Sequence, residues 1–452
     1  MNTCVGIDLG STTTKAVVLG EDGRILGRGI TNSRSNYEVA CNVALTEALI
    51  DARFGLLSAD LARAGVDPQT ARAALAELER RFREEQYREH LRELVRRIHR
   101  LADGGDRDGL RVLDAPARDS DPATTRRTVG IVLERMDAET SELFAAGARR
   151  KSDFFRDLAG SRYLALAETA CRETGAVFDR LAGLFDKAIL EVENVPAAAS
   201  QFGDHVRAAL ARLDAAPEAL RTAVQTAADV EMLVAASVGT GYGRATLPFP
   251  KEQIRSEILC HGLGAHAMFP GTRTVLDIGG QDTKAIQVDD TGIVTSFQMN
   301  DRCAAGCGRY LGYIADEMNL GVHELGPIAC SSTRNVRINS TCTVFAGAEL
   351  RERLSLGERR EDILAGLHRA IILRAMSLLA RSGGVAEEFT FTGGVARNEA
   401  AVSALRGLVF DNYGEVTMNI SPDSIFTGAL GAALFAHRGQ VGTAHAVEGA
   451  SA

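Results

Sequence analysis

The sequence predicts an α/β protein in which two related domains face each other across a cleft, with a large all-α segment inserted into the first. Two observations support this class. A pattern of strand, tight turn, strand, turn and strand occurs at residues 5–30 and again at 275–299. Between these copies the chain is rich in Ala, Leu, Arg and Glu and has helical periodicity. A chain of 452 residues is long enough for several domains with separate cores.

The two copies of this strand-turn-strand pattern align without a gap. The first reads VGIDLGSTTTKAVVLGEDGRILGRGI, and the second reads VLDIGGQDTKAIQVDDTGIVTSFQM. The alignment pairs Asp8 with Asp277, Gly10 with Gly279, Lys15 with Lys284 and Gly23 with Gly292. We interpret the pair as one supersecondary unit that occurs twice.

Each copy ends its first strand on an acidic residue that is followed by a turn of small residues. Backbone N–H groups and hydroxyls in such turns can hold phosphate oxygens, and a pair of carboxylates suits Mg2+ and an attacking water. The alternative is two ordinary hairpins, but the match between the copies favours a polyphosphate site with Asp8 and Asp277 as catalytic groups. The predicted binding residues in the two turns are Gly10, Ser11, Thr12, Thr13, Thr14, Lys15, Gly279, Gly280, Gln281 and Asp282.

Residues 41–228 are predicted to form a helical insertion. Apolar residues such as Leu75, Leu78 and Phe82 fall at three- and four-residue steps, on one face of a helix. Glycine- and proline-containing breaks divide the region into several helices, as in a small bundle. Its charge runs are interpreted as solvated helix faces, and the alternative is a docking platform for another subunit.

The chain after the insertion returns to glycine-rich, alternating sequence. Glu257 and His261 lie four residues apart and therefore share one helix face. They could form an ordinary surface or capping contact, or they could reach the cleft or bind a metal. In FTFTGGVARN, Gly393 and Gly394 leave room for a ring or ribose, and Asn398 can hydrogen-bond to it. The predicted segments are 1–40 with 229–268 as the first domain, 269–424 as the second, a crossing helix at 425–438 and a flexible tail at 439–452.

The composition indicates which partners and which cellular compartment to expect. With 51 Lys and Arg against 59 Asp and Glu, the net charge of -8 gives no reason to expect nucleic acid or an anionic membrane as a partner. The first residues do not read as a signal peptide, and no stretch approaches the roughly 18 uninterrupted apolar residues of a membrane span. We therefore expect a cytoplasmic protein whose eight cysteines are core residues or metal ligands.

Seven motifs, in order, resemble one known family. They are IDLGSTTTK, VGTGYGR, LDIGGQDTK, MNDRCAAGCGRY, STCTVFA, FTGGVARN and GALGAALFA. Together they look like the ATP-hydrolysing activators of 2-hydroxyacyl-CoA dehydratases and the related ATPase subunits of benzoyl-CoA reductase. The resemblance covers residues 1 to about 38 and 231 to about 438.

The resemblance implies two ribonuclease-H-like domains of the actin, Hsp70 and sugar-kinase type with ATP and Mg2+ between them. It also implies that each chain gives Cys303 and Cys342 to a [4Fe-4S] cluster shared between two subunits. Both cysteines precede helix-like runs whose N-termini would point at the anionic cluster. A second arrangement stays open, because Cys303, Cys307, Cys330 and Cys342 together offer the four thiolates that a cluster needs within one chain. The family usually has Thr where this chain has Cys307. We interpret Cys4, Cys41, Cys171 and Cys260 as buried core residues.

The function implied by the resemblance is ATP-driven, low-potential electron transfer to a partner enzyme. The size of the insertion favours the larger ATPase subunit of benzoyl-CoA reductase, which pairs with a homologous subunit, receives electrons from a ferredoxin-type donor and serves an acyl-CoA reductase. The alternatives are a homodimeric dehydratase activator, a sugar or polyol kinase, and an Hsp70- or actin-like protein. A kinase would need an acidic base in the cleft beyond Asp8 and Asp277, and no motif supplies one.

Overall fold

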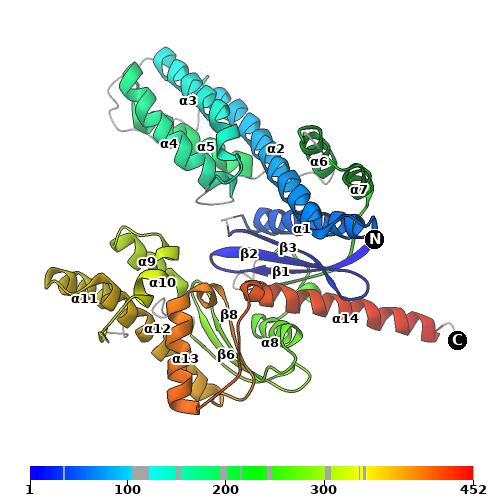
Figure 1. Ribbon diagram of the computed structural model, residues 1–452, viewed down its shortest axis with the longest axis vertical. Coiled ribbons are helices and arrows are strands. Elements are labelled where there is room, and N and C mark those ends of the chain that lie inside the picture. The colour runs from blue at the N-terminus through cyan, green and yellow to red at the C-terminus, as the bar shows by residue number, and fades with distance from the viewer. Residues whose placement is uncertain are drawn as a thin grey trace. The chain divides into compact units, whose positions relative to one another are not determined.

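The protein forms two compact units, which are residues 1–49 with 232–452, and residues 50–231. The structure is a computed structural model, and Figure 1 shows its helices and strands. It describes residues 1–33, 36–103, 122–148, 154–193, 201–213, 216–241, 247–300, 307–334, 336–338 and 343–450. Cys303 and Cys342 lie outside these residues.

The first sheet contains the first copy of the repeat. Its strands in spatial order are β3 (Ile25–Asn32), β2 (Thr13–Leu19), β1 (Asn2–Leu9) and β4 (Leu233–Gly241). The first three strands pair antiparallel, and β4 pairs parallel with β1. Strand β1 is buried along almost its whole length, because both faces of the sheet are covered by helices.

The second sheet repeats this arrangement and adds one strand. Its order is β7 (Val294–Asn300), β6 (Thr283–Val288), β5 (Thr274–Ile278), β8 (Phe389–Thr392) and β9 (Met418–Asn419). Strands β5, β6 and β7 pair antiparallel, and β8 pairs parallel with β5. In the first copy Asp8 lies opposite Lys15, and in the second Asp277 lies opposite Lys284. The structure therefore confirms that one unit occurs twice.

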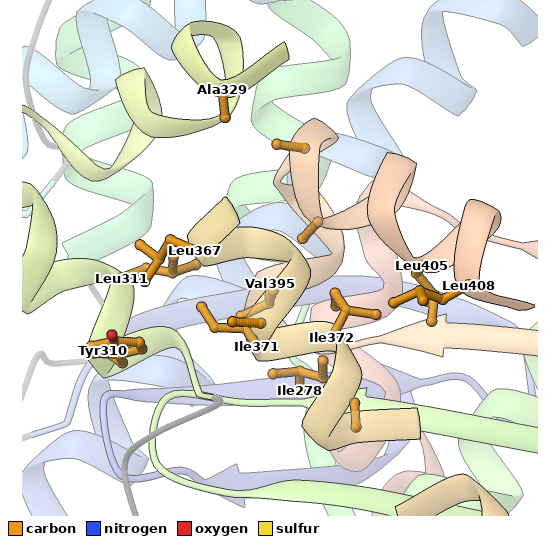
Figure 2. Packing of buried hydrophobic residues seen from close by; sticks show 14 of the residues in the cluster. Ile278, Tyr310, Leu311, Ala329, Leu367, Ile371, Ile372, Val395, Leu405 and Leu408 are labelled. Atoms are coloured by element: carbon orange, nitrogen blue, oxygen red, sulfur yellow. The ribbon is translucent and has the colours of Figure 1, made fainter. Parts of the chain in front are cut away.

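Helices of the larger unit surround these sheets. They are α8 (Glu257–Met268), α9 (Gly308–Glu317), α10 (Val322–Cys330), α11 (Thr343–Ser355), α12 (Arg360–Ser382), α13 (Glu399–Tyr413) and α14 (Thr427–Ala450). Short 3-10 turns are η3 (Lys251–Gln253), η4 (Gly394–Arg397) and η5 (Pro422–Phe426). Figure 2 shows the core of the second sheet, where Leu367, Ile371 and Ile372 of α12 lie between α9 and α13.

Helix α12 is the one helix among the described residues that is long and apolar enough to cross a membrane. However, 67% of its apolar window is buried inside the protein. A buried core helix passes the same test of length and composition, so the burial accounts for the apolar sequence.

Helices α8 and α14 pack closely against each other and on the first sheet because glycines remove side chains at the contacts. A Cβ on Gly431 would lie 1.8 Å from the Cys260 carbonyl oxygen, and one on Gly264 would lie 2.0 Å from that of Thr427. On the sheet side, a Cβ on Gly6 of β1 would lie 2.1 Å from the Ala429 carbonyl oxygen. These backbone contacts leave no room for a larger residue.

The smaller unit is entirely helical in the part that the structure describes. Its helices are the end of α1 (Tyr37–Arg63), α2 (Pro68–Ala102), α3 (Pro122–Leu143), α4 (Phe155–Thr174), α5 (Phe178–Glu193), α6 (Gln201–Ala211) and α7 (Glu218–Asp229). One core joins α1, the start of α2, α6 and α7, and another joins the end of α2 to α3, α4 and α5. The buried carboxylate of Glu84 on α2 pairs with Arg88 and Arg212.

Three predicted boundaries differ from the structure. The insertion begins near residue 50 rather than 41, because Cys41, Ala44 and Ala48 of α1 pack on the first sheet. Helix α8, predicted to belong to the first domain, also packs on the second sheet, where Ile258 and Ala265 join the core with Val275. The last helix continues to Ala450, past residue 438, where the flexible tail was predicted to begin.

Candidate functional site

A cavity of about 1270 Å3 in the larger unit is lined by the turns of both repeat copies. Most of the predicted site residues line it. They are Asp8, Gly10, Ser11, Thr12, Thr13, Lys15, Asp277, Gly279, Gly280, Asp282, Gly393, Gly394 and Asn398. The turns approach each other closely, since a Cβ on Gly280 would lie 2.2 Å from Thr12 Oγ1.

The first turn is held from behind by Ser33. The Ser33 hydroxyl donates to the Gly10 carbonyl oxygen at 2.6 Å, and the Ser33 N–H donates to the Thr12 carbonyl oxygen at 2.9 Å. The Thr14 hydroxyl lies 3.0 Å from the Ser33 hydroxyl and is buried. Thr14 was predicted to bind a ligand. It supports the turn instead and is not among the described residues that line the cavity.

The second turn is held by its own backbone and by the start of α9. The Gly279 N–H donates to the Asp282 carbonyl oxygen at 3.0 Å. The Gly308 and Arg309 N–H groups donate to the Gly279 and Gly280 carbonyl oxygens, both at 2.8 Å. Gln281, also predicted as a binding residue, is not among the described residues that line the cavity.

Lys284 is the centre of a buried ion-pair cluster behind the second turn. Its ammonium group lies 2.9 Å from Glu257 Oε1, 2.9 Å from Asp282 Oδ1 and 3.4 Å from Asp277 Oδ2. Only 1% of the Lys284 side chain is exposed, so the three carboxylates surround a cation that water barely reaches. Such a cluster is stable only while every member keeps its partners.

The cluster shifts the pKa values of its members. Burial alone would raise the pKa of Asp277, but the charges on His261 and Lys284 and a hydrogen bond from Thr392 lower it to about 2. Burial would lower the pKa of Lys284, but the three carboxylates hold it well above its usual value. Burial raises the pKa of Glu257 in spite of Lys284 and His261. Asp277 and Lys284 therefore form a fixed pair of opposite charges.

Asp8 is much less tightly bonded than its counterpart. Its Oδ2 lies 3.9 Å from the Lys15 ammonium, and its Oδ1 has no hydrogen-bond partner among the described residues, although only 4% of Asp8 is exposed. The neighbouring Thr240 hydroxyl donates instead to the Arg255 carbonyl oxygen. A buried carboxylate oxygen without a donor is costly unless a ligand satisfies it.

Glu257 and His261 enter the same cavity from α8. His261 Nδ1 lies 3.4 Å from Asp277 Oδ1, and its Nε2 lies 3.9 Å from Glu257 Oε1. With Asp8 they bring three ligand atoms within 4.8 Å of one another, a group that could hold a metal ion. Sequence spacing indicated their common face, and the structure puts that face in the cleft. Glu257 thus adds a carboxylate to the cavity besides Asp8 and Asp277, which no sequence motif had indicated.

Residues of α9, α10 and the Gly393–Gly394 turn also line the cavity. Asp316, His323 and Gly326 line it beside the two predicted glycines. The Asn398 side-chain oxygen accepts hydrogen bonds from the Ala400 and Ala401 N–H groups, so it caps α13. The predicted role of Asn398 in binding a ligand is thereby limited to its amide nitrogen.

The described cysteines differ in accessibility. Cys4, Cys41, Cys171 and Cys260 are buried, which confirms their interpretation as core residues. Cys307 is also buried, with its sulfur 3.5 Å from the Thr283 hydroxyl, and burial raises the pKa of its thiol to about 11. Cys330 is exposed. Helix α11 begins directly after the predicted ligand Cys342. Helix α9 has Cys307 as its N-cap and begins at Gly308, which is five residues after the predicted ligand Cys303.

These residues fit a nucleotide with a divalent cation. The two turns supply small residues and backbone N–H groups, which suit phosphate oxygens. The unpaired oxygen of Asp8 suits a hard cation. Gly428 keeps space beside it, since a Cβ there would lie 2.8 Å from both Asp8 Oδ2 and His261 Nε2.

Comparisons with known proteins agree with this chemistry. A model of the BadF/BadG/BcrA/BcrD ATPase family matches residues 5–436. The (R)-2-hydroxyglutaryl-CoA dehydratase activating ATPase of Acidaminococcus fermentans is 42% identical over 205 residues, which are 45% of this chain and 76% of that protein. The 2-hydroxyisocaproyl-CoA dehydratase activator of Clostridioides difficile is 44% identical over 201 residues, 44% of this chain and 72% of that protein.

Two further comparisons concern the reductase and the fold. A benzoyl-CoA reductase component from Thauera aromatica is 31% identical over 175 residues, 39% of this chain and 62% of that protein. The solved activator of the 2-hydroxyisocaproyl-CoA dehydratase from Clostridium difficile with bound ADPNP is 22% identical and superposes with a TM-score of 0.50, covering 98% of this chain and 97% of that one. This likeness concerns the fold alone. With the duplicated sheets, it confirms the predicted actin, Hsp70 and sugar-kinase type.

Proposed function

Because the chain belongs to the BadF/BadG/BcrA/BcrD ATPase family, we propose that it is the ATP-hydrolysing activator of a 2-hydroxyacyl-CoA dehydratase. The size of the insertion favoured the benzoyl-CoA reductase type. The relatives favour the alternative, since identity is 42% and 44% with two dehydratase activators but 31% with the reductase component. The size of an inserted unit says little about the chemistry of the domains around it.

The observation that carries the proposal is the cavity in which the two turns meet beside Asp8, whose Oδ1 has no hydrogen-bond partner among the described residues. In this proposal the turns from Gly10 to Lys15 and from Gly279 to Asp282 hold the phosphates of ATP. Asp8 would hold Mg2+, whose positive charge would stabilise the negative charge on the γ-phosphoryl group. Asp277 keeps Lys284 in place and acts through it.

The proposal includes the iron-sulfur cluster that the resemblance implies. Cys303 and Cys342 of two subunits would supply the four thiolates of one [4Fe-4S] cluster, whose role is to carry one electron. A cluster held within one chain would need Cys307 and Cys330 as well. The buried position of Cys307 and the raised pKa of its thiol count against that arrangement.

The partners follow from this role. The protein would work as a cytoplasmic dimer, accept electrons from a ferredoxin-type donor and pass them to the catalytic subunits of the dehydratase. A heterodimer with a homologous subunit and an acyl-CoA reductase as acceptor is the benzoyl-CoA reductase version of the same scheme. Neither version needs a nucleic acid or a membrane.

The test is anaerobic purification followed by an iron count, a visible spectrum and an activation assay. We expect a brown protein with about two iron atoms per chain, and about four would indicate a cluster within one chain. Cys303→Ala and Cys342→Ala should lose iron, and the matched control Cys330→Ala should keep it.

In the activation assay, MgATP and a reductant should allow the protein to activate a purified 2-hydroxyacyl-CoA dehydratase. If the protein activated only the catalytic subunits of benzoyl-CoA reductase, it would be the ATPase subunit of that reductase, as the size of the insertion first indicated. A colourless protein that hydrolyses ATP equally well in both cysteine variants would contradict electron transfer altogether.

A further inference from the structure

Three side chains that can bind a metal converge from two elements of the larger unit. One ligand atom each of Asp8 on β1 and of Glu257 and His261 on α8 lie within 4.8 Å of one another. The three residues are buried, with exposed fractions of 4%, 9% and 6%. Two carboxylates and an imidazole at this separation form a ligand set for a divalent metal ion.

The imidazole of His261 is oriented as in a metal site. Its Nε2 and Asp8 Oδ2 face the same place, because a Cβ on Gly428 would lie 2.8 Å from each of them. Bonds from a metal to such nitrogen and oxygen atoms are about 2.0–2.2 Å long, so a small approach of both atoms completes two of them. On the other side of the ring, Nδ1 lies 3.4 Å from Asp277 Oδ1. A carboxylate behind the second ring nitrogen is the usual support of a metal-binding histidine.

The surroundings of these ligands call for a cation. Asp8 Oδ1 and His261 Nδ1 are buried without a hydrogen-bond partner among the described residues. In the ion pairs that the structure describes here, four carboxylates share two ammonium groups, because Lys15 faces Asp8 while Lys284 faces Asp277, Asp282 and Glu257. With a neutral imidazole, two negative charges are left over in a buried place, which equals the charge of one divalent ion.

We propose that the protein binds a resident divalent transition-metal ion through Asp8 Oδ2, His261 Nε2 and the Glu257 carboxylate, in the absence of nucleotide. The imidazole ligand favours a first-row transition metal over Mg2+, which prefers oxygen ligands and keeps several waters. Asp8 Oδ1 stays available to the Mg2+ that would accompany ATP, so the resident ion is a second one. The inference goes beyond the proposed function, because the three side chains converge without a nucleotide.

The resident ion gives the first copy of the repeat what Lys284 gives the second. Lys284 joins three carboxylates, including Asp277 of β5 and Glu257 of α8. The ion joins Asp8 of β1 to the same helix α8. A ligand that binds only the folded protein raises its stability by mass action, so the ion stabilises the site before ATP arrives.

The test is Mn2+ binding to the full-length, anaerobically purified protein without nucleotide. Mn2+ suits carboxylate and imidazole ligands, whereas Zn2+ would also bind the thiolates of the chain. We expect about one bound Mn2+ ion per chain, which an about tenfold excess of Mg2+ does not displace. Its pulsed EPR spectrum should show coupling to an imidazole nitrogen.

The decisive variant is His261→Gln, which keeps a polar side chain but removes the nitrogen ligand. It should lose the nitrogen coupling and bind Mn2+ at least about tenfold more weakly. The matched control is His266→Gln, on the same helix but not among the described residues that line the cavity. This control should keep both the affinity and the coupling.

Wild-type protein with isotopically labelled histidine covers the case in which His261→Gln does not fold, because the label should change the nitrogen coupling while the sequence stays the same. Bound Mn2+ without histidine coupling overturns the inference. So does Mn2+ that binds only together with ATP, because that ion would be the one of the proposed function. If Mn2+ binds as expected but the protein hydrolyses no ATP, the proposed function fails instead, and the two failures are distinguishable.

Discussion

The first and second copies of the repeat place the same residue types around their carboxylates. Asp8 lies opposite Lys15 on β2 and beside Thr240 on the parallel strand β4. Asp277 lies opposite Lys284 on β6 and beside Thr392 on the parallel strand β8. A glycine with positive φ follows each threonine, namely Gly241 with φ 112° and Gly393 with φ 86°. The duplication thus includes a fourth strand, in addition to the three strands that the sequence alignment identified.

The bonds within the two copies differ. The Thr392 hydroxyl donates to Asp277 Oδ1 at 2.8 Å, and Lys284 lies 3.4 Å from Oδ2. The Thr240 hydroxyl donates to a backbone carbonyl instead, and Lys15 stays 3.9 Å from Asp8. The same backbone therefore supports a closed charge cluster in one copy and a partly unbonded carboxylate in the other. The difference indicates that the carboxylate of the second copy holds the site together, whereas the carboxylate of the first copy is available to a ligand.

The largest expected difference between the copies concerns the two lysines. Lys284→Met leaves three buried carboxylates without their shared cation and should lower the free energy of unfolding by about 3–5 kcal/mol. Lys15→Met removes a more distant and more exposed partner of a single carboxylate, so it should cost less than Lys284→Met does. Urea unfolding followed by circular dichroism measures both. Equal losses would contradict the assignment of the cluster to the second copy.

Acid should also separate the copies. The folded pKa of Asp277 is about 2 against an ordinary 3.8, so its contribution is present above pH 3.8 and is lost as the pH falls toward 2. This difference is worth roughly 2 kcal/mol, and about 1 kcal/mol of it should be gone at pH 3. Unfolding of wild type and Asp277→Asn at pH 5 and pH 3 checks the sign. A gap between them that widens at pH 3 would exclude the expected linkage.

The smallest difference concerns the two threonines. Thr392→Val removes a buried hydrogen bond to Asp277 and should lower the free energy of unfolding by about 1–3 kcal/mol. Thr240→Val should give a similar loss, because it removes the hydrogen bond from the Thr240 hydroxyl to the Arg255 carbonyl oxygen. Only Thr392→Val should raise the pKa of Asp277. An unchanged acid dependence in Thr392→Val would show that the hydroxyl does not stabilise the carboxylate.

Local features of the sequence were enough to predict the hairpins. Strand alternation and a turn glycine act within a few residues, so the copies at Asp8 and Asp277 were recognisable and their turns line the cavity as expected. The direction of Thr14 was not predictable, because it depends on Ser33, nineteen residues along the chain. Asn398 was predicted to bind a ligand, although its position before a helix also suits a cap.

The role of Glu257 and His261 depended on contacts between distant segments. Their four-residue spacing shows a shared helix face but not what that face meets. The face lies in the cleft because glycines 6, 264 and 431 let α8, α14 and β1 approach closely. The start of the inserted unit was predicted too early for a similar reason. The first residues of α1 are helical like the insertion, but they pack on the first sheet.

The most direct test of the account is the rate of MgATP hydrolysis by Asp8→Asn at saturating nucleotide. Because Asp8 Oδ1 is unpaired among the described residues, the variant should unfold within about 0.5 kcal/mol of wild type or be slightly more stable. It should nevertheless hydrolyse ATP at least about 100-fold more slowly, since the group facing the cation loses its charge. A folded Asp8→Asn protein that hydrolyses ATP at the wild-type rate would contradict the assignment of the first copy to the ligand.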